Sequence, residues 1–140
     1  MPSQIVERGR SKAYRPLPEP ARREAFARAL AAYDRGDFFL AHELLEPAWM
    51  GSDDPAERAL HSGLIKLAAA FVHDVRGNPA GIAKNLAGAR DRLAAAGPAG
   101  PAWGVDVPAI VASVDDGLAS LTAGELPSPI PIHRLRRRDR

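Results

Sequence analysis

A histidine, a glutamate and a tryptophan recur at helical spacing near the middle of the chain. His42 is followed by Glu46 and Trp49, and on a helix both later side chains would lie within about 40° of the histidine. Phe38 and Leu45 share that face, so we expect it to point toward the core. A helix places a histidine and a carboxylate on its apolar side when they pair, bind a ligand or take part in a reaction.

Metal binding is one chemistry that this pair can provide. An imidazole nitrogen and a carboxylate oxygen one helical turn apart can both reach a divalent zinc, manganese or iron ion. Two ligands do not make a tight site, and His73 on the following helix is the best candidate for a third. Glu43 and His61 are further candidates, and Glu43, Trp49 and Lys66 are expected to line the same site.

Two other interpretations of the motif stay open. The segment from His42 to Glu46 resembles the His-Glu-x-x-His helix of zinc peptidases, but a glutamate replaces the second histidine and Pro47 follows it. Alternatively, His42 and Glu46 pair with each other or with Lys66 and His73, in a buried polar network that holds helices in register. No catalytic residue is assigned, and whether the chain is an enzyme stays open.

Composition limits the class of protein. The chain has 140 residues, of which 46% are hydrophobic and 26% charged, as in an ordinary single globular domain. It contains no cysteine, which excludes disulfides, thiolate metal sites and thiol nucleophiles and fits the reducing cytoplasm where we place it. No apolar run approaches the roughly 18 residues of a membrane span, so we expect no membrane association.

The positive charges are concentrated at the two ends of the chain. Residues 1–16 carry four basic side chains and one acidic one, and residues 133–140 carry five arginines and one aspartate. The residues between them hold 10 basic and 15 acidic side chains. Any nucleic-acid binding would therefore have to use the basic termini, and we do not expect it of the folded part.

Apolar periodicity predicts five helices and no strand. Glycines followed by capping residues separate the helices, as in Arg35-Gly36-Asp37, which favours antiparallel hairpins. The fold class is therefore all-α, a compact bundle of about five mostly antiparallel helices, with the most apolar helix at its centre. The predicted helices run over about 20–35, from the cap at Asp37 to Trp49, 55–76, 79–93 and 108–121.

The chain divides into three predicted parts. Residues 1–16 form a flexible basic N-terminal segment, and residues 17–126 form a single helical domain. Residues 127–140 form a flexible tail that is first proline-rich and then arginine-rich, because the proline spacing excludes regular structure.

The motif and its surroundings resemble the bacterial and archaeal family called domain of unknown function 309. The resemblance is carried by residues 35–49, 63–73 and 76–81, and it covers roughly residues 22–96. The family pattern His-x-x-x-Glu-x-x-Trp/Tyr, which is proposed to bind metal, falls on His42, Glu46 and Trp49. Lys66 stands where the family commonly has glutamine. A lysine there would repel a cation unless its pKa falls or it points away, and it favours an anion or a carboxylate partner.

The resemblance implies an all-helical bundle and no known activity. Two functions therefore remain open. The first is a metal- or small-ligand-binding domain built on His42, Glu46 and Trp49. The second is a non-catalytic protein-interaction or dimerisation module, in which alanine-rich faces such as residues 68–70 and 94–96 allow close contact in a homodimer.

Overall fold

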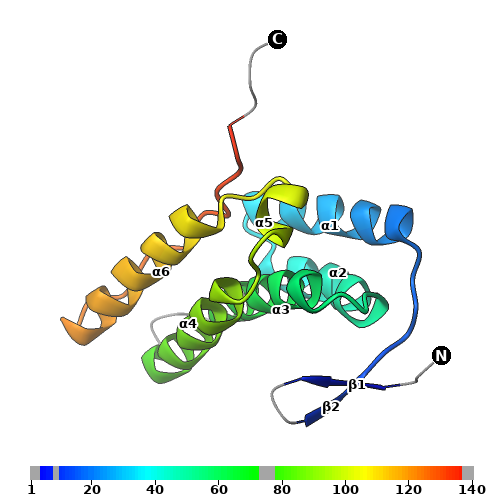
Figure 1. Cartoon of the computed structure of the whole chain (residues 1–140). Coiled ribbons are helices and arrows are strands. Elements are labelled where there is room, and N and C mark those ends of the chain that lie inside the picture. Colours follow the sequence, from blue (N-terminus) through cyan, green and yellow to red (C-terminus); the bar gives the residue numbers. More distant parts are fainter. Residues whose placement is uncertain (1–3, 8–9, 73–77, 137–140) are drawn as a thin grey trace.

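The structure is a computed structural model that describes residues 4–7, 10–72 and 78–136 (Figure 1). Its described part is a bundle of five long helices and one short one, so the predicted all-α fold is confirmed. Each long helix packs on the next long helix along the chain. The helices are α1 (Glu19–Asp34), α2 (Phe38–Gly51), α3 (Pro55–Ala70), α4 (Pro79–Ala94), the short α5 (Ala99–Ala102) and α6 (Val107–Thr122).

Side-chain caps fix where four of these helices begin. Each cap accepts a hydrogen bond from the backbone N–H three residues later, which satisfies one of the unpaired donors at a helix start. The capping residues are Asp37, which the sequence analysis expected, and Asp54, Asn78 and Asp106. Gly36, with φ of 86°, makes the left-handed turn between α1 and α2 that only glycine adopts freely.

Helix α3 lies at the centre of the bundle, between α2 and α4. Its Leu60, Leu64 and Leu67 are completely buried, which confirms the helix predicted to be central. It ends at Ala70, however, and not at Arg76 as predicted. Phe71 leaves the helical conformation and packs its ring 5.9 Å from that of Phe38 at the start of α2. Residues 73–77 lie outside the described part.

The expectation of no strand was wrong. Strands β1 (Gln4–Glu7) and β2 (Arg10–Ala13) form an antiparallel hairpin, with Gln4 opposite Ala13. Neither segment alternates apolar and polar residues, so periodicity could not reveal these strands. The chain then joins the end of α2, where Leu17 donates its N–H to the carbonyl of Gly51 at 3.1 Å. A Cβ on Gly51 would lie 2.4 Å from that of Leu17, so this approach requires glycine.

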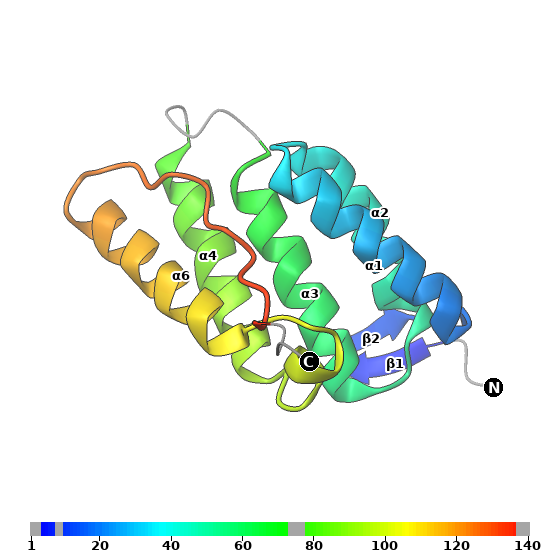
Figure 2. The ribbon, with the colours of Figure 1, turned by 90° about the horizontal axis from the view of Figure 1, so that it is seen from above.

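We call residues 127–136 the C-terminal strap. These residues form neither a helix nor a strand, and their one regular backbone pairing is a single bridge between Arg134 and Val105. This agrees with the irregular structure predicted from its prolines. Two of its side chains are nevertheless packed, because Ile130 and Ile132 are only 4% and 3% exposed. Figure 2 shows it running between α6 and α1, where its two isoleucines complete the core.

Two glycines offer a matched test of the helix packing. A Cβ on Gly63 of α3 would lie 2.7 Å from Cγ and 3.1 Å from the backbone nitrogen of Leu93 in α4. We expect Gly63→Ala to force the two helices apart and to destabilise the fold by about 1–3 kcal/mol. A Cβ on Gly88 meets only the flexible ends of Arg92 and Lys66, so Gly88→Ala should stabilise it by about 0.5–1 kcal/mol. Urea unfolding measures the change in unfolding free energy for each variant. Equal changes in the two variants would contradict this packing.

Candidate functional site

His42 and Glu46 lie on α2 as a surface pair. His42 Nδ1 is 3.7 Å from Glu46 Oε1, and the two side chains are 29% and 42% exposed. The pair is therefore open to solvent and is not the buried network that the sequence left open as an alternative. Two clefts of about 440 and 450 Å³ lie elsewhere, and neither is lined by these two residues.

The side of α2 that faces the core is rotated by about one residue position from the predicted side, which carries His42 and Trp49. The side of α2 that faces the core is formed by Ala41, Leu45 and Ala48, all completely buried. Alanines at two of these positions let α2 approach its neighbours closely, which moves His42 to the margin of the contact. The larger side chains of Phe38 and Trp49, used to assign the apolar face, are only partly buried.

Trp49 contacts a buried arginine. The guanidinium carbon of Arg58 in α3 lies 4.9 Å from the centre of the indole ring, and Arg58 itself is completely buried. Arg58 donates hydrogen bonds to the carbonyl oxygens of Trp49 at 3.0 Å and Ser52 at 2.8 Å. These contacts tie the end of α2 to the start of α3. The indole Nε1 is buried without a hydrogen-bond partner among the described residues.

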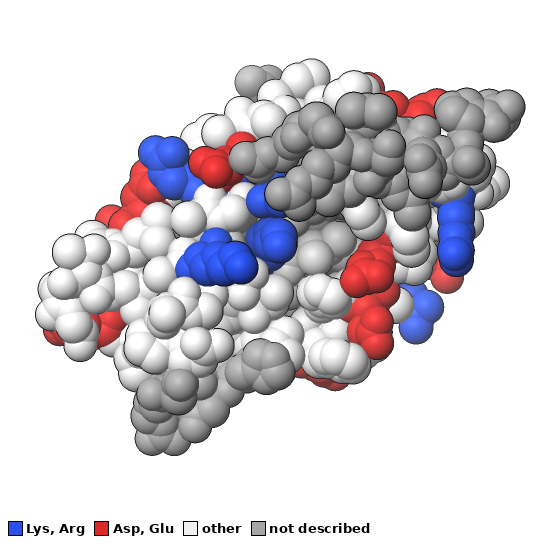
Figure 3. All heavy atoms as spheres, turned by 90° about the horizontal axis from the view of Figure 1, so that it is seen from below, with Lys and Arg blue, Asp and Glu red and all other residues white. Residues whose placement is uncertain are grey.

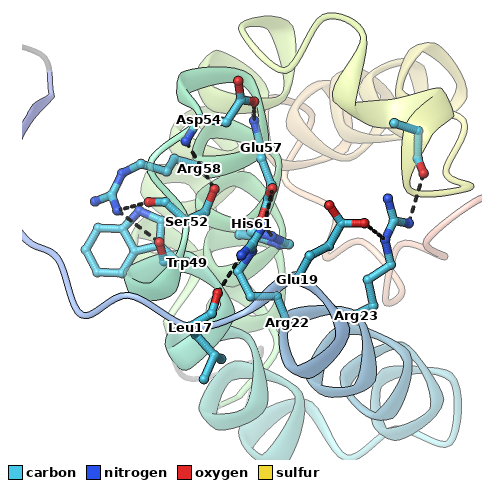
Figure 4. A network of polar contacts seen from close by, with 11 residues as sticks. Leu17, Glu19, Arg22, Arg23, Trp49, Ser52, Asp54, Glu57, Arg58 and His61 are labelled. Carbon is cyan, nitrogen blue, oxygen red and sulfur yellow. Dashed lines mark hydrogen bonds and ion pairs between the residues drawn. The ribbon is translucent and has the colours of Figure 1, made fainter.

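The buried polar network of this protein is formed by Arg22, Glu57 and His61 (Figure 4). Arg22 of α1 donates from Nε and Nη2 to the Glu57 carboxylate of α3, at 2.6 and 3.1 Å. His61 Nε2 lies 3.1 Å from the same carboxylate, one turn along α3. Glu57 is 7% exposed and His61 is fully buried, so the network connects α1 to α3 inside the bundle.

Aromatic rings surround His61. Its ring centre lies 5.3 Å from that of Phe26 in α1 and 4.8 Å from that of Trp103, which follows α5. Arg23 covers the other part of this cluster, with its guanidinium carbon 4.1 Å from the centre of the Trp103 ring. Apolar surroundings disfavour a charged imidazole.

Protonation follows from this environment. Burial lowers the pKa of His61 below 6.5 although Glu57 opposes it, so the imidazole is neutral at pH 7 and donates its Nε2 proton to the carboxylate. Burial by itself would raise the pKa of Glu57, but hydrogen bonds from His61 and Arg22 outweigh it and lower the pKa to about 2. His61 Nδ1 is then an acceptor without a partner among the described residues.

The remaining predicted site residues do not converge on His42. Glu43 is exposed on α2, and Lys66 of α3 leans toward α4, with Cγ and Cδ 3.6 Å from where a Cβ on Gly88 would lie. His73 lies outside the described residues. Within the part of the chain that the structure describes, no group of three His, Cys, Asp or Glu side chains could hold a metal ion.

Charges of both signs share the face of the bundle seen in Figure 3. Lysine and arginine side chains gather near its middle, and acidic side chains lie toward both sides. No helix among the described residues is long and apolar enough to cross a membrane. Nucleic-acid binding through the basic termini stays a prediction.

The comparisons agree with the resemblance seen in the sequence. The family model described as a domain of unknown function (DUF309) matches residues 26–85. Residues 26–85 form a DUF309 domain. The match runs from the middle of α1 into α4, and it therefore contains the His42–Glu46 pair, Trp49, and Glu57 and His61 of the buried network. No curated protein and no solved structure matched the chain.

Sequence reasoning missed the buried network although a local signal was present. Glu57 and His61 have the same separation of four residues as His42 and Glu46, and they lie on the helix predicted to be central. A carboxylate and a histidine on a buried helix need a partner. The partner, Arg22, lies 35 residues earlier on α1, and no periodicity within either helix could identify it.

The network predicts acid sensitivity. Both groups bind protons more weakly in the folded chain than in the unfolded chain, so unfolding takes up protons as the pH falls. The free energy of unfolding should be highest above about pH 6.5 and should decrease below it, because His61 is protonated in the unfolded chain first. It should decrease further between pH 4.5 and about 2, because the unfolded chain protonates Glu57 before the folded chain does. Urea unfolding along this pH range measures the effect.

The Glu57→Gln variant isolates the carboxylate. It should lose about 3 kcal/mol near neutral pH, because Arg22 keeps a buried charge without its partner, and show less pH dependence below 4.5. Glu43→Gln on exposed α2 is the control and should behave like the parent protein. A Glu57→Gln protein as stable as the control would show that the network contributes nothing to the fold.

Proposed function

We propose that the DUF309 domain binds a divalent metal ion through His42 and Glu46 on the surface of α2. The observation that supports this is that His42 Nδ1 and Glu46 Oε1 lie 3.7 Å apart and that both side chains are accessible to solvent. Ligand atoms around a tetrahedral zinc ion with bonds of about 2.0–2.1 Å lie roughly 3.4 Å apart. A small side-chain rotation therefore brings both groups into bonding range without moving α2.

The donor types fit the metals expected from the sequence. One imidazole and one carboxylate suit zinc, manganese or iron, each of which would be held as a resident ion. The pair supplies two ligands, whereas stable protein sites use three or four, so His73, water or a bound small molecule must complete the site. Such a site exchanges its metal readily and presents open coordination positions to a ligand.

The neighbouring residues support the pair rather than bind the ion. Trp49 has one ring face near the Arg58 guanidinium and lies on the same side of α2 as Glu46, three residues away. It would form an apolar wall of the site. Lys66 leans toward α4, which removes the repulsion that a lysine beside a cation would cause.

An interaction module is the second candidate, and one observation favours it. Phe39, on α2 one turn before His42 and Glu43, is 59% exposed and is the most exposed large hydrophobic side chain among the described residues. The alanine-rich dimer face predicted on α3 receives less support, because Ala68 and Ala70 are buried inside the bundle. In this interpretation α2 contacts a protein partner. A homodimer and a cytoplasmic location stay predictions.

Metal binding is tested with substitutions along α2. Untagged protein purified without chelator should bind zinc, and His42→Ala should weaken the affinity at least tenfold because one of the two ligands in the pair is lost. Calorimetric titration with zinc alone measures the affinity, and elemental analysis of the purified protein measures retained metal.

The control is Glu43→Gln, which removes a neighbouring carboxylate outside the pair and should leave zinc affinity unchanged. Exposed pairs contribute only about 0.3–0.5 kcal/mol, so His42→Ala should remain folded. Equal zinc affinity in parent, His42→Ala and Glu46→Gln proteins would exclude the proposed site and leave the interaction module.

A further inference from the structure

A cleft of about 450 Å³ lies where the chain enters α1, beside the end of α2. Its apolar lining is formed by Pro16, Leu17 and Pro18, and polar groups come from Tyr14, Arg22 and Asp53. We call it the Tyr14 cleft. Small-molecule sites in proteins have volumes of about 300–1,000 Å³ and combine an apolar lining with a few polar groups, as this cleft does.

Backbone hydrogen bonds hold one wall of the Tyr14 cleft against the end of α2. Arg15 donates its N–H to the carbonyl of Met50 at 2.8 Å, and Leu17 donates its own to that of Gly51 at 3.1 Å. Gly51 also lines the cleft, and its missing Cβ allows Leu17 to come this close. The shape of the cleft therefore depends on contacts within the chain and needs no ligand to form.

Arg22 brings two uncommitted donors to the cleft. A guanidinium group has five N–H donors in a fixed plane. Two of those of Arg22 donate to the Glu57 carboxylate, and a third donates to the carbonyl of Leu17, as Figure 4 shows. The other two have no acceptor among the residues that the structure describes, and the side chain is 15% exposed. Glu57 thus holds in place a guanidinium whose remaining N–H groups can bind a carboxylate.

Two further polar groups of the cleft have no partner within the described part of the chain. The Tyr14 side chain is only 7% exposed, yet its hydroxyl makes no hydrogen bond there. Asp53 is exposed, and its carboxylate forms neither a hydrogen bond nor an ion pair with a described residue. Both groups can therefore pair with a ligand without breaking a contact of the fold.

Negative charge lies beside these donors. Glu57 balances the charge of Arg22, which leaves Asp53 as the net charge of the lining. Helix α2 ends at Gly51, so the negative end of its dipole adds to this charge. Hydrogen bonding to Glu57 raises the pKa of Arg22, and the charge of Asp53 adds to this effect, so Asp53 lies near the guanidinium. A ligand therefore finds donors for an anionic group and a carboxylate for a cationic group in one cleft.

The cleft of about 440 Å³ beside the strap does not offer the same groups. Its lining includes Tyr33 and Asp34 of α1 and Ile130 of the strap. The Tyr33 hydroxyl donates to the carbonyl of Ile130, and Asp34 pairs with Arg134, whose Nη2 lies 2.8 Å from Oδ2. The tyrosine hydroxyl and the carboxylate of that cleft are therefore already used by the fold.

We propose that the Tyr14 cleft binds a free α-amino acid with an apolar side chain. The ligand carboxylate accepts hydrogen bonds from the remaining N–H groups of Arg22 and from the Tyr14 hydroxyl, and the ammonium group donates to Asp53. The ligand side chain packs on the apolar lining. An amino acid is a zwitterion without net charge, so each of its charged groups finds an opposite partner. This site does not involve the metal ligands proposed on α2.

Titration of the full-length protein with L-leucine, L-methionine and L-phenylalanine tests the proposal, with amide NMR spectra recorded in metal-free buffer. We expect binding at millimolar concentration, with the largest shift changes at the amide signals of Leu17, Gly51 and Asp53. Isopentylamine and isocaproate keep the side chain of leucine and each lose one charged group, so each should bind about tenfold more weakly. No shift change with any of the three amino acids, or equal affinity for L-leucine and either analogue, would overturn the proposal.

Two substitutions separate the roles of the cleft residues. Asp53→Asn removes the charge that pairs with the ammonium group, so it should weaken L-leucine binding about tenfold and should not weaken isocaproate binding. Tyr14→Phe removes one donor to the carboxylate and should weaken L-leucine binding about threefold. Because neither polar group has a partner in the described fold, both variants should unfold at the same urea concentration as the parent protein.

The control is Asp116→Asn, which removes an exposed carboxylate on α6 and should leave the affinity for L-leucine unchanged. A folded Asp53→Asn protein that binds L-leucine as tightly as this control would show that the amino acid binds outside the cleft, and would equally contradict the proposal.

Discussion

The ion pair between Arg22 and Glu57 is the contact on which the arrangement of the bundle depends. Glu57 lies in the first turn of α3, where its backbone N–H bonds to the Asp54 cap at 2.8 Å and where the helix dipole stabilises its negative charge. Arg22 brings α1 to that point and also donates to the carbonyl of Leu17, which joins the N-terminal segment to the bundle. His61 extends the network to the rings of Phe26 and Trp103.

Environment separates two histidine–glutamate pairs that the sequence presents alike. His42 with Glu46 and Glu57 with His61 both have the spacing of one helical turn, and both lie within the matched family domain. The first pair is partly exposed and its acceptor and donor atoms remain accessible. The second is enclosed by aromatic rings and an arginine, so burial lowers the pKa of its histidine. This difference in accessibility is the reason why we propose ligand binding for the first pair only, whereas the second pair connects α1 to α3 inside the bundle.

Local sequence signals predicted the helices and their caps, because these depend on residues three or four apart. Asp37, Asn78 and Asp106 each begin a helix where expected. Features that depend on distant residues could not be predicted in the same way. Phe71, where α3 ends, packs against Phe38 of α2, and Ile130 of the strap lies beside Gly117 of α6, so both features involve residues far apart in the sequence. The core side of α2 was misassigned because the small Ala41 and Ala48 carry it, whereas large side chains dominate an apolarity pattern.

Nitrogen-detected NMR of the four histidines, titrated with pH and then with zinc, tests most directly the division of roles between the two pairs. Our account predicts that His61 is neutral, with its proton on Nε2, at pH values where an ordinary histidine is already charged, and that zinc leaves its signals unchanged. The same addition of zinc should shift the signals of His42. A His61 that titrates with the ordinary pKa of 6.5, or that responds to zinc while His42 does not, would contradict the account.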